Sequence, residues 1–204
     1  MSTNPNDTEK AILRAAEEEF MLKGYGGART TAIAQKAGVT HAMLHYYYRT
    51  KESLFDRVIS AKASELLDHV LSLYAVEEDA TFADKICHVV EHHFNLLQQN
   101  PLLPSFILSE LRGNPERLES WFAKMGEAVR NLTPELQREI TRAAEEGHIC
   151  NISVAELLTD ILGMNISSVC FADVLCRIYG LSRKEYLVMR LSENVELIRR
   201  RLMP

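Results

Sequence analysis

The chain has 204 residues, of which 47% are hydrophobic, and its formal net charge is −5. This length allows one domain or two small ones, and the apolar share is sufficient for a packed core. No uncharged apolar run reaches the length of a membrane span, and the polar N-terminus lacks the apolar segment of a signal peptide. We therefore expect a cytoplasmic protein that does not enter a membrane.

Helical periodicity dominates the chain, and no segment shows the alternation of a strand. The first helix is predicted over residues 8–23, with Ile12, Ala16 and Phe20 on its inward face, and Gly24 is expected to end it. The four cysteines have no CxxC pairing, which predicts small buried thiols in a reducing compartment.

Charge is distributed unevenly. Residues 1–60 carry a net charge of +1, and the rest of the chain carries −6. Between residues 20 and 51 there is no Asp or Glu, whereas there are five Lys or Arg, two His and four Tyr. In an acidic chain, a basic stretch of this length predicts contact with a polyanion, and the acidic remainder is expected to have another task.

This basic stretch has the pattern of two short helices. Thr30 or Thr31 can cap the first, which ends at Gly38, and Thr40 can cap the second over residues 41–48. Two helices joined by a short turn with Gly form a helix-turn-helix, whose second helix enters the major groove of DNA. Leu44 and Tyr48 fall on the inward side of the second helix and are expected in the core.

Capping and proline signals divide the rest of the chain into further helices. The predicted spans are 51–74, 82–99, 102–111, 115–131, 134–147, 153–179 and 182–202. Short connections between them predict a helical bundle. The fold class is therefore all-α, with about ten helices in an N-terminal three-helix helix-turn-helix domain and a larger C-terminal bundle.

Four motifs follow one another between residues 8 and 58. They are IL-AA-EEF (12–20), GY (24–25), IAQKAGVT (33–40) and LHYYYRTKESLF (44–55). In order, spacing and residue type this segment resembles the DNA-binding domain of the TetR family of transcriptional regulators. The resemblance implies a DNA-binding domain over residues 1–52 and a ligand-binding and dimerisation domain over residues 53–204. His45 and Arg29 depart from the family pattern, which usually has Tyr and often has Ser or Thr at these positions.

The resemblance also implies which residues contact double-stranded DNA. They are Thr30, Thr31, Thr40, His41, Ala42, Met43, His45, Tyr46, Tyr47 and Lys51. Hydroxyl groups and amides at helix N-termini suit phosphate oxygens, and Lys51 would add a cation. His41, Ala42 and Met43 are expected at base edges. Because no arginine lies on this face, we expect readout by shape and apolar contact.

A single helix-turn-helix covers half a site, so a homodimer on a near-palindromic operator is expected. The resemblance implies a dimer surface on the helices at 153–179 and 182–202, although the first of these could instead be the central core helix. It also implies an unidentified small-molecule effector. The candidate lining residues, which could equally fill a core, are Cys87, Phe94, Phe106, Trp121, Met125 and Met164.

Other chemistry is weakly indicated. His88 and His92 have a spacing that can hold a metal ion, but no third ligand follows, so a surface pair is expected. No catalytic constellation is evident, and we expect neither an enzyme nor a cofactor. The predicted function is a TetR-like regulator, a repressor relieved by a bound ligand. The alternative is a helical ligand-binding or architectural DNA-binding protein without a specific operator, which the ratio of specific to non-specific affinity would distinguish.

Overall fold

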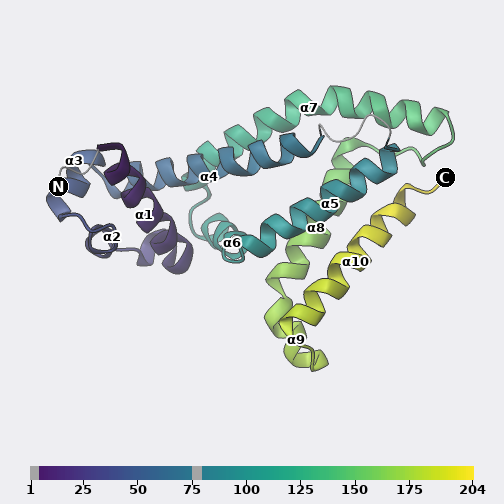
Figure 1. The fold of residues 1–204 in the computed structure, drawn as a ribbon. Helices are drawn as coiled ribbons and strands as arrows, with labels where there is room; N and C mark the ends of the chain where they lie inside the picture. Colours follow the sequence, from purple (N-terminus) through teal and green to yellow (C-terminus); the bar gives the residue numbers. More distant parts are fainter. Residues whose placement is uncertain (1–4, 75–79) are drawn as a thin grey trace. The chain divides into compact units, whose positions relative to one another are not determined.

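The computed structural model describes residues 5–74 and 80–204, and the described residues are helical without a strand (Figure 1). They contain ten α-helices and one short 3-10 helix, which confirms the predicted all-α class. The elements are α1 (Pro5–Gly27), α2 (Thr30–Lys36), α3 (His41–Tyr47), α4 (Lys51–Tyr74), α5 (Phe82–Gln99), α6 (Leu103–Gly113), η1 (Pro115–Leu118), α7 (Glu119–Glu145), α8 (Val154–Cys170), α9 (Ala172–Tyr179) and α10 (Arg183–Leu202).

The chain divides into two compact units. The first comprises Met1–Leu66 and Ser105–Met125, and the second comprises Leu67–Pro104 and Gly126–Pro204. The first unit thus combines the N-terminal helices with α6, η1 and the start of α7. The functional division predicted from the sequence, 1–52 and 53–204, remains a prediction.

The first unit is built around α1, against which α2 packs, and α3 packs against α2 in turn. Phe20 and Phe55 meet edge to face with ring centroids 5.1 Å apart, and Phe106 from α6 lies 6.0 Å from Phe55. All three rings are buried. Aromatic burial of this kind holds segments that are distant in sequence in one core.

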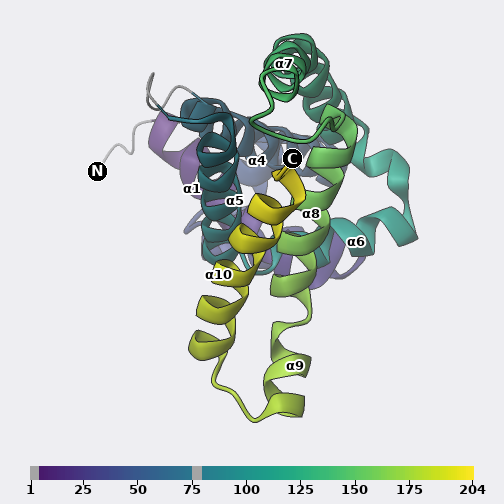
Figure 2. The same cartoon turned by 90° about the vertical axis from the view of Figure 1, so that its right-hand side faces the viewer.

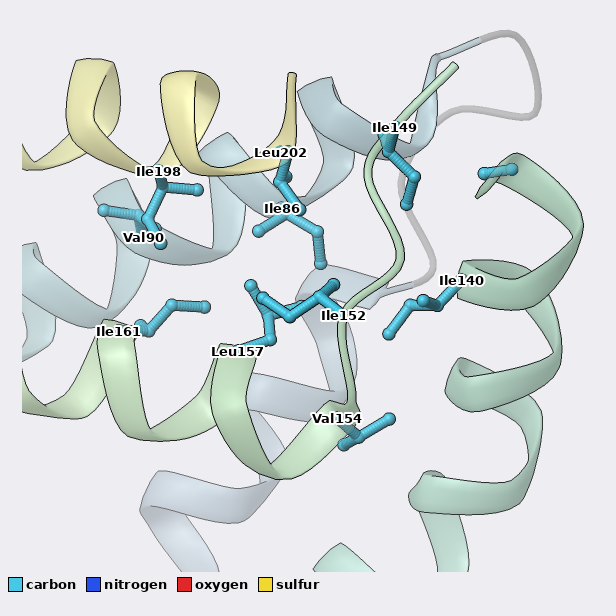
Figure 3. Packing of buried hydrophobic residues seen from close by; sticks show 11 residues of the cluster. Ile86, Val90, Ile140, Ile149, Ile152, Val154, Leu157, Ile161, Ile198 and Leu202 are labelled. Atoms are coloured by element: carbon cyan, nitrogen blue, oxygen red, sulfur yellow. The ribbon is translucent and has the colours of Figure 1, made fainter. Parts of the chain in front are cut away.

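The second unit is centred on α5, α8 and α10, which pack against one another (Figures 1 and 2). Their facing side chains are aliphatic and point toward a common interior (Figure 3). The buried residues of this cluster are Ile86, Val90, Ile140, Ala143, Ile149, Ile152, Val154, Leu157, Ile161, Ile198 and Leu202. The predicted helix at 153–179 therefore contributes to the core of its own chain.

Polar side chains interrupt this apolar packing at one place. Asn165 of α8 and Asn194 of α10 are both 0% exposed, and the Asn194 amide donates to Asn165 Oδ1 at 2.9 Å. Asn165 in turn donates to the carbonyl of Val90 at 2.9 Å and lies 3.1 Å from His93 Nδ1. Arg190 donates to Asn194 Oδ1 at 2.7 Å. The cluster is thus connected by hydrogen bonds, as buried polar groups require.

Local capping signals were good guides to helix starts. The Thr81 hydroxyl accepts from the amide of Asp84 at 3.2 Å, directly before the helix predicted over residues 82–99. Ser153 forms a capping box with Glu156, and Ser182 forms a second one with Glu185. These caps satisfy amides that have no partner inside the helix.

Two predicted helix boundaries were wrong. Residues 115–131 and 134–147 were expected as separate helices, but α7 continues through Pro134, and Thr133 donates its hydroxyl to the carbonyl of Val129 at 2.7 Å instead of capping. The loss of one backbone hydrogen bond at an exposed proline is tolerated in a long helix. The helix expected over 153–179 breaks at Phe171, so that α8 and α9 are separate and bent by 63°.

Two smaller expectations were met only in part. Cys87 is buried, but Cys150, Cys170 and Cys176 are only partly so, and none of the four is in a disulfide. The first helix extends to Gly27, although Gly24, with φ 67°, has non-helical geometry where the helix was expected to end.

Within the described ranges, no single helix is long and apolar enough to cross a membrane. The bent pair of α8 and α9 reaches the required length and composition only when taken together.

Candidate nucleic-acid interface

The turn between α2 and α3 is set by a glycine. Gly38 has φ +70°, the amide of Val39 donates to the carbonyl of Ala34 at 3.0 Å, and the amide of Gly38 donates to Gln35 at 3.1 Å. This is the hydrogen-bond pattern of a Schellman motif, which ends a helix with a left-handed residue. The predicted Gly-containing turn is therefore present, and it determines where α3 starts.

We expect Gly38→Ala to lower the free energy of unfolding by about 1 kcal/mol, because an L-residue is strained at positive φ. Strain is the only cost, since an added Cβ would meet nothing within 4 Å. Gly113→Ala is the control, because Gly113 also has open space but no positive φ. Chemical denaturation measures both, and equal effects of the two substitutions would contradict this explanation.

The start of α3 agrees with the prediction, whereas the start of α2 does not. Thr40 Oγ1 accepts from the amide of Met43 at 3.1 Å and caps α3. Thr30 and Thr31 were expected to cap α2, but Arg29 holds the cap position without a side-chain hydrogen bond. A carboxylate from α1 takes over part of this role, because Glu19 accepts from the amide of Arg29 at 3.4 Å.

α3 turns one face inward. Leu44 and Tyr48 are buried, as predicted, and the Tyr48 hydroxyl donates to Glu9 at 3.0 Å. Burial, with Glu9 as acceptor, raises the pKa of Tyr48 to about 12. The inward face of α3 is therefore neutral and anchored to α1.

The opposite face of α3 is open. The exposed residues of the predicted DNA-contact set are Thr31, Thr40, His41, Ala42, Met43, His45 and Tyr46, while Thr30, Tyr47 and Lys51 are partly buried. Tyr46 is 84% exposed, which is unusual for a large aromatic side chain. These side chains are therefore accessible to a binding partner.

Side chains on the open face also contact one another. The His41 and His45 rings meet edge to face at 4.4 Å, and so do the Tyr46 and Tyr47 rings at 5.6 Å. His41 Nε2 lies 3.1 Å from Thr30 Oγ1, which links the recognition helix to the start of α2. These contacts reduce the conformational freedom of the side chains before any ligand binds.

The positive charge of this region is smaller than the sequence suggests. Lys23 pairs with Glu19 at 2.7 Å, and Lys36 pairs with Glu18 at 2.5 Å. Lys23 is the main cause that lowers the pKa of Glu19. Arg29 and Arg49, which were not in the predicted contact set, are exposed. Their exposure makes them further candidates for phosphate contact, and the acid-free segment already contained this signal.

Lys51 stands at the first turn of α4, next to a tyrosine. Its Nζ lies 4.5 Å from the centroid of the Tyr25 ring, and the Tyr25 hydroxyl donates to Glu52 at 2.5 Å. Burial, together with the Glu52 carboxylate, raises the pKa of Tyr25 to about 12. Tyr25 therefore contacts two side chains of α4.

The six residues predicted to line an effector pocket lie in different units. Phe106, Trp121 and Met125 belong to the first, and Cys87, Phe94 and Met164 belong to the second. Phe94 packs in a second apolar cluster with Val169 and Tyr186. Cys87, Phe94 and Phe106 are buried, and Met164 packs against the apolar cluster of its unit. Trp121 and Met125 are only partly buried. The role of all six in binding an effector stays a prediction.

The histidine pair of α5 is on the surface. His88 and His92 are both exposed. Among the residues that the structure describes, no group of three or more His, Cys, Asp or Glu could hold a metal ion.

Comparison with known proteins agrees with this geometry. Residues 12–58 match the model of the family described as bacterial regulatory proteins, tetR family. The fatty acid metabolism regulator protein of Bacillus subtilis (strain 168) is 25% identical over 138 residues, which are 68% of this chain and 69% of that protein. The regulator RutR of Escherichia coli (strain K12) is 40% identical over 72 residues, 35% of this chain and 32% of RutR.

A solved structure shows the same fold. FadR from Bacillus subtilis, in complex with stearoyl-CoA, superimposes with a TM-score of 0.59 at 20% identity, covering 95% of this chain and 99% of FadR. At this level of identity the likeness concerns the fold.

An exposed recognition helix, held by a capped turn against a three-helix head, defines a helix-turn-helix DNA-binding transcriptional regulator. Its N-terminal segment, residues 12–58, matches the DNA-binding domain of the TetR family of these regulators.

Proposed function

We propose that this regulator is a homodimeric repressor, which binds a near-palindromic operator through α3 and is released by a small molecule bound in residues 53–204. The observation that carries the proposal is the open face of α3, where His41, Ala42 and Met43 are exposed at the N-terminal end of the helix. Recognition helices contact base edges with their N-terminal residues. We place the protein in the cytoplasm with its DNA, and we propose no enzymatic activity.

Exposed apolar side chains on α8, α9 and α10 support the dimer. They are Leu162, Phe171, Val174, Ile178, Tyr179, Val188, Met189 and Leu197. Gly163 and Ser167 of α8 are also exposed, and a Cβ added at Gly163 would meet nothing within 4 Å. Small residues on an open helix face allow a second helix to approach closely. Ser168 and Ala172, in contrast, are buried against the chain's own helices.

The relatives suggest a class of effector for the first test. The match to the Bacillus subtilis fatty acid regulator covers 138 residues, so it must extend well beyond the 66 residues that open the first unit. The structure of Bacillus subtilis FadR contains stearoyl-CoA. A long-chain acyl thioester is therefore the first effector to assay, and free fatty acid and coenzyme A are the controls.

The test is selection of binding sites from a pool of random DNA duplexes, followed by gel-shift titration of the selected sequence. We expect a palindromic consensus, two chains per duplex, and affinity at least about 10³-fold above that for unrelated DNA at physiological salt. Selection of no consensus, with equal binding to all duplexes, would instead support the architectural alternative. If no tested compound released the DNA, the proposed regulation by a small molecule would be wrong, whereas the proposed binding to an operator would still stand.

Two substitutions on α3 should distinguish a side chain that contacts phosphate from one that contacts base edges. Tyr47→Ala is expected to weaken all operator variants by a similar factor, roughly fivefold, because a phosphate contact carries no sequence information. Met43→Ala is expected to change which base is preferred, since an apolar contact to a base edge distinguishes sequences by about 1–3 kcal/mol. Titration of single-base operator variants measures both effects. The assignment fails if the two substitutions give the same profile.

A further inference from the structure

Tyr25 is contacted by residues far from it in the sequence. Besides Lys51 and Glu52 of α4, it meets Arg117 of η1, whose guanidinium carbon lies 4.1 Å from the ring centroid. The Tyr25 backbone amide donates to Glu110 Oε1 of α6 at 2.9 Å. All these residues belong to the first unit. One tyrosine therefore joins the end of α1 and the start of α4 to the α6–η1 segment.

The break in α1 at Gly24 leaves a backbone amide to which Glu110 binds. Gly24 breaks α1 with φ 67° and ψ 172°, which leaves the next amide, that of Tyr25, without a helical partner. The Glu110 carboxylate, in a side chain only 5% exposed, accepts from that amide and pairs with Arg117 at 3.3 Å. A buried carboxylate is stable only with such partners. A Cβ on Gly24 would lie 3.4 Å from Glu110 Oε1, so the two segments approach closely.

We propose that Glu110 and Arg117 are positioning residues for DNA binding, which act through Tyr25 to hold Lys51 at the first turn of α4. Glu110 and Arg117 fix the backbone and the ring of Tyr25. The ring attracts the Lys51 ammonium through its π face, and the hydroxyl holds Glu52. A lysine that is ordered before binding loses less side-chain entropy when it meets a phosphate. This inference rests on the proposed contact between Lys51 and DNA.

The test is a double-mutant cycle of Arg117→Ala and Lys51→Ala, with affinity for the selected operator as readout. We expect Arg117→Ala to weaken binding about fivefold when Lys51 is present and less than twofold when Lys51 is already alanine. Arg112→Ala is the matched control, because it removes the same charge from an exposed position of α6. It should weaken binding less than twofold.

Other roles of Arg117 predict different results. If Arg117 touched DNA itself, or only stabilised the fold, its loss would be equal in both backgrounds, and the proposal would be overturned. If Lys51→Ala had no effect, the proposed phosphate contact would be wrong, which is a separate failure. Thermal unfolding accompanies each titration. If Arg117→Ala unfolds, the cycle is repeated with Arg117→Lys, where an equal loss in both backgrounds again overturns the proposal.

Discussion

Replacing Asn165 with leucine is expected to lower the free energy of unfolding by about 2–3 kcal/mol, although leucine is apolar and similar in size. The reason is the cluster between α5, α8 and α10. Asn165 Oδ1 accepts from Asn194, and Asn165 Nδ2 donates to the carbonyl of Val90. Without Asn165, the Asn194 amide nitrogen keeps only a long hydrogen bond to Ser168, at 3.3 Å, while Asn194 Oδ1 still accepts from Arg190. A buried polar group that loses its partner bears its full cost of desolvation.

The double variant should cost less than the sum of the single ones. Asn165→Leu with Asn194→Leu removes both members of the pair, so neither amide is left without the other. Asn95→Leu, at an exposed position of α5, is the control for adding leucine and should change stability by less than about 0.5 kcal/mol. Denaturation must be measured at one protein concentration, because association would also shift the transition. Strictly additive losses would show that the two asparagines are not coupled.

Acid should destabilise the second unit through His93. Burial lowers the pKa of this imidazole to about 4, below its ordinary value of 6.5. The unfolded chain therefore binds the proton more readily than the folded one. The contribution of the neutral His93 to the free energy of unfolding is fully present above pH 6.5 and is lost as the pH falls toward 4. This contribution is about 2 kcal/mol after allowance for the partial exposure of the ring.

His93→Gln removes the titrating group and keeps a side chain that can hydrogen-bond to Asn165. The variant is expected to lose less stability than the unsubstituted chain between pH 6.5 and pH 4. His88→Gln, at an exposed position of the same helix, is the control for replacing a histidine of α5 with glutamine. The difference between the stability curve of the unsubstituted chain and that of a variant cancels the contributions of all other titrating groups to the pH dependence. Parallel pH curves for the unsubstituted chain and His93→Gln would contradict the role given to His93.

Several elements could be predicted because their causes are local. Thr40, Thr81, Ser153 and Ser182 cap helices by accepting from amides three residues away, so the pattern and the contact coincide in the sequence. Gly38 is equally local, since its positive φ belongs to one residue. The helix-turn-helix followed from these signals.

At Pro134 and Phe171 the local sequence did not predict the helix boundaries correctly. A threonine followed by proline is a common helix start, yet α7 continues through it, because the helical pattern on both sides outweighs one missing hydrogen bond. At Phe171 the chain bends without a glycine or proline, so no residue type announced the break. The exposure of the Phe171 ring can be interpreted only when α8 and α9 are known to be separate helices.

The amino-acid sequence by itself determined most of the helices, the turn between the two short ones, and the acid-free segment that we propose to face DNA. Only the tertiary structure decided which charges in that segment are neutralised, since Glu18 meets Lys36 across two helices. It also placed Glu110 beside an amide 85 residues earlier in the chain, and Asn194 beside Asn165. Hydrogen bonds and ion pairs act over a few ångströms in space, and the distance between residues along a chain does not reveal which of them will meet.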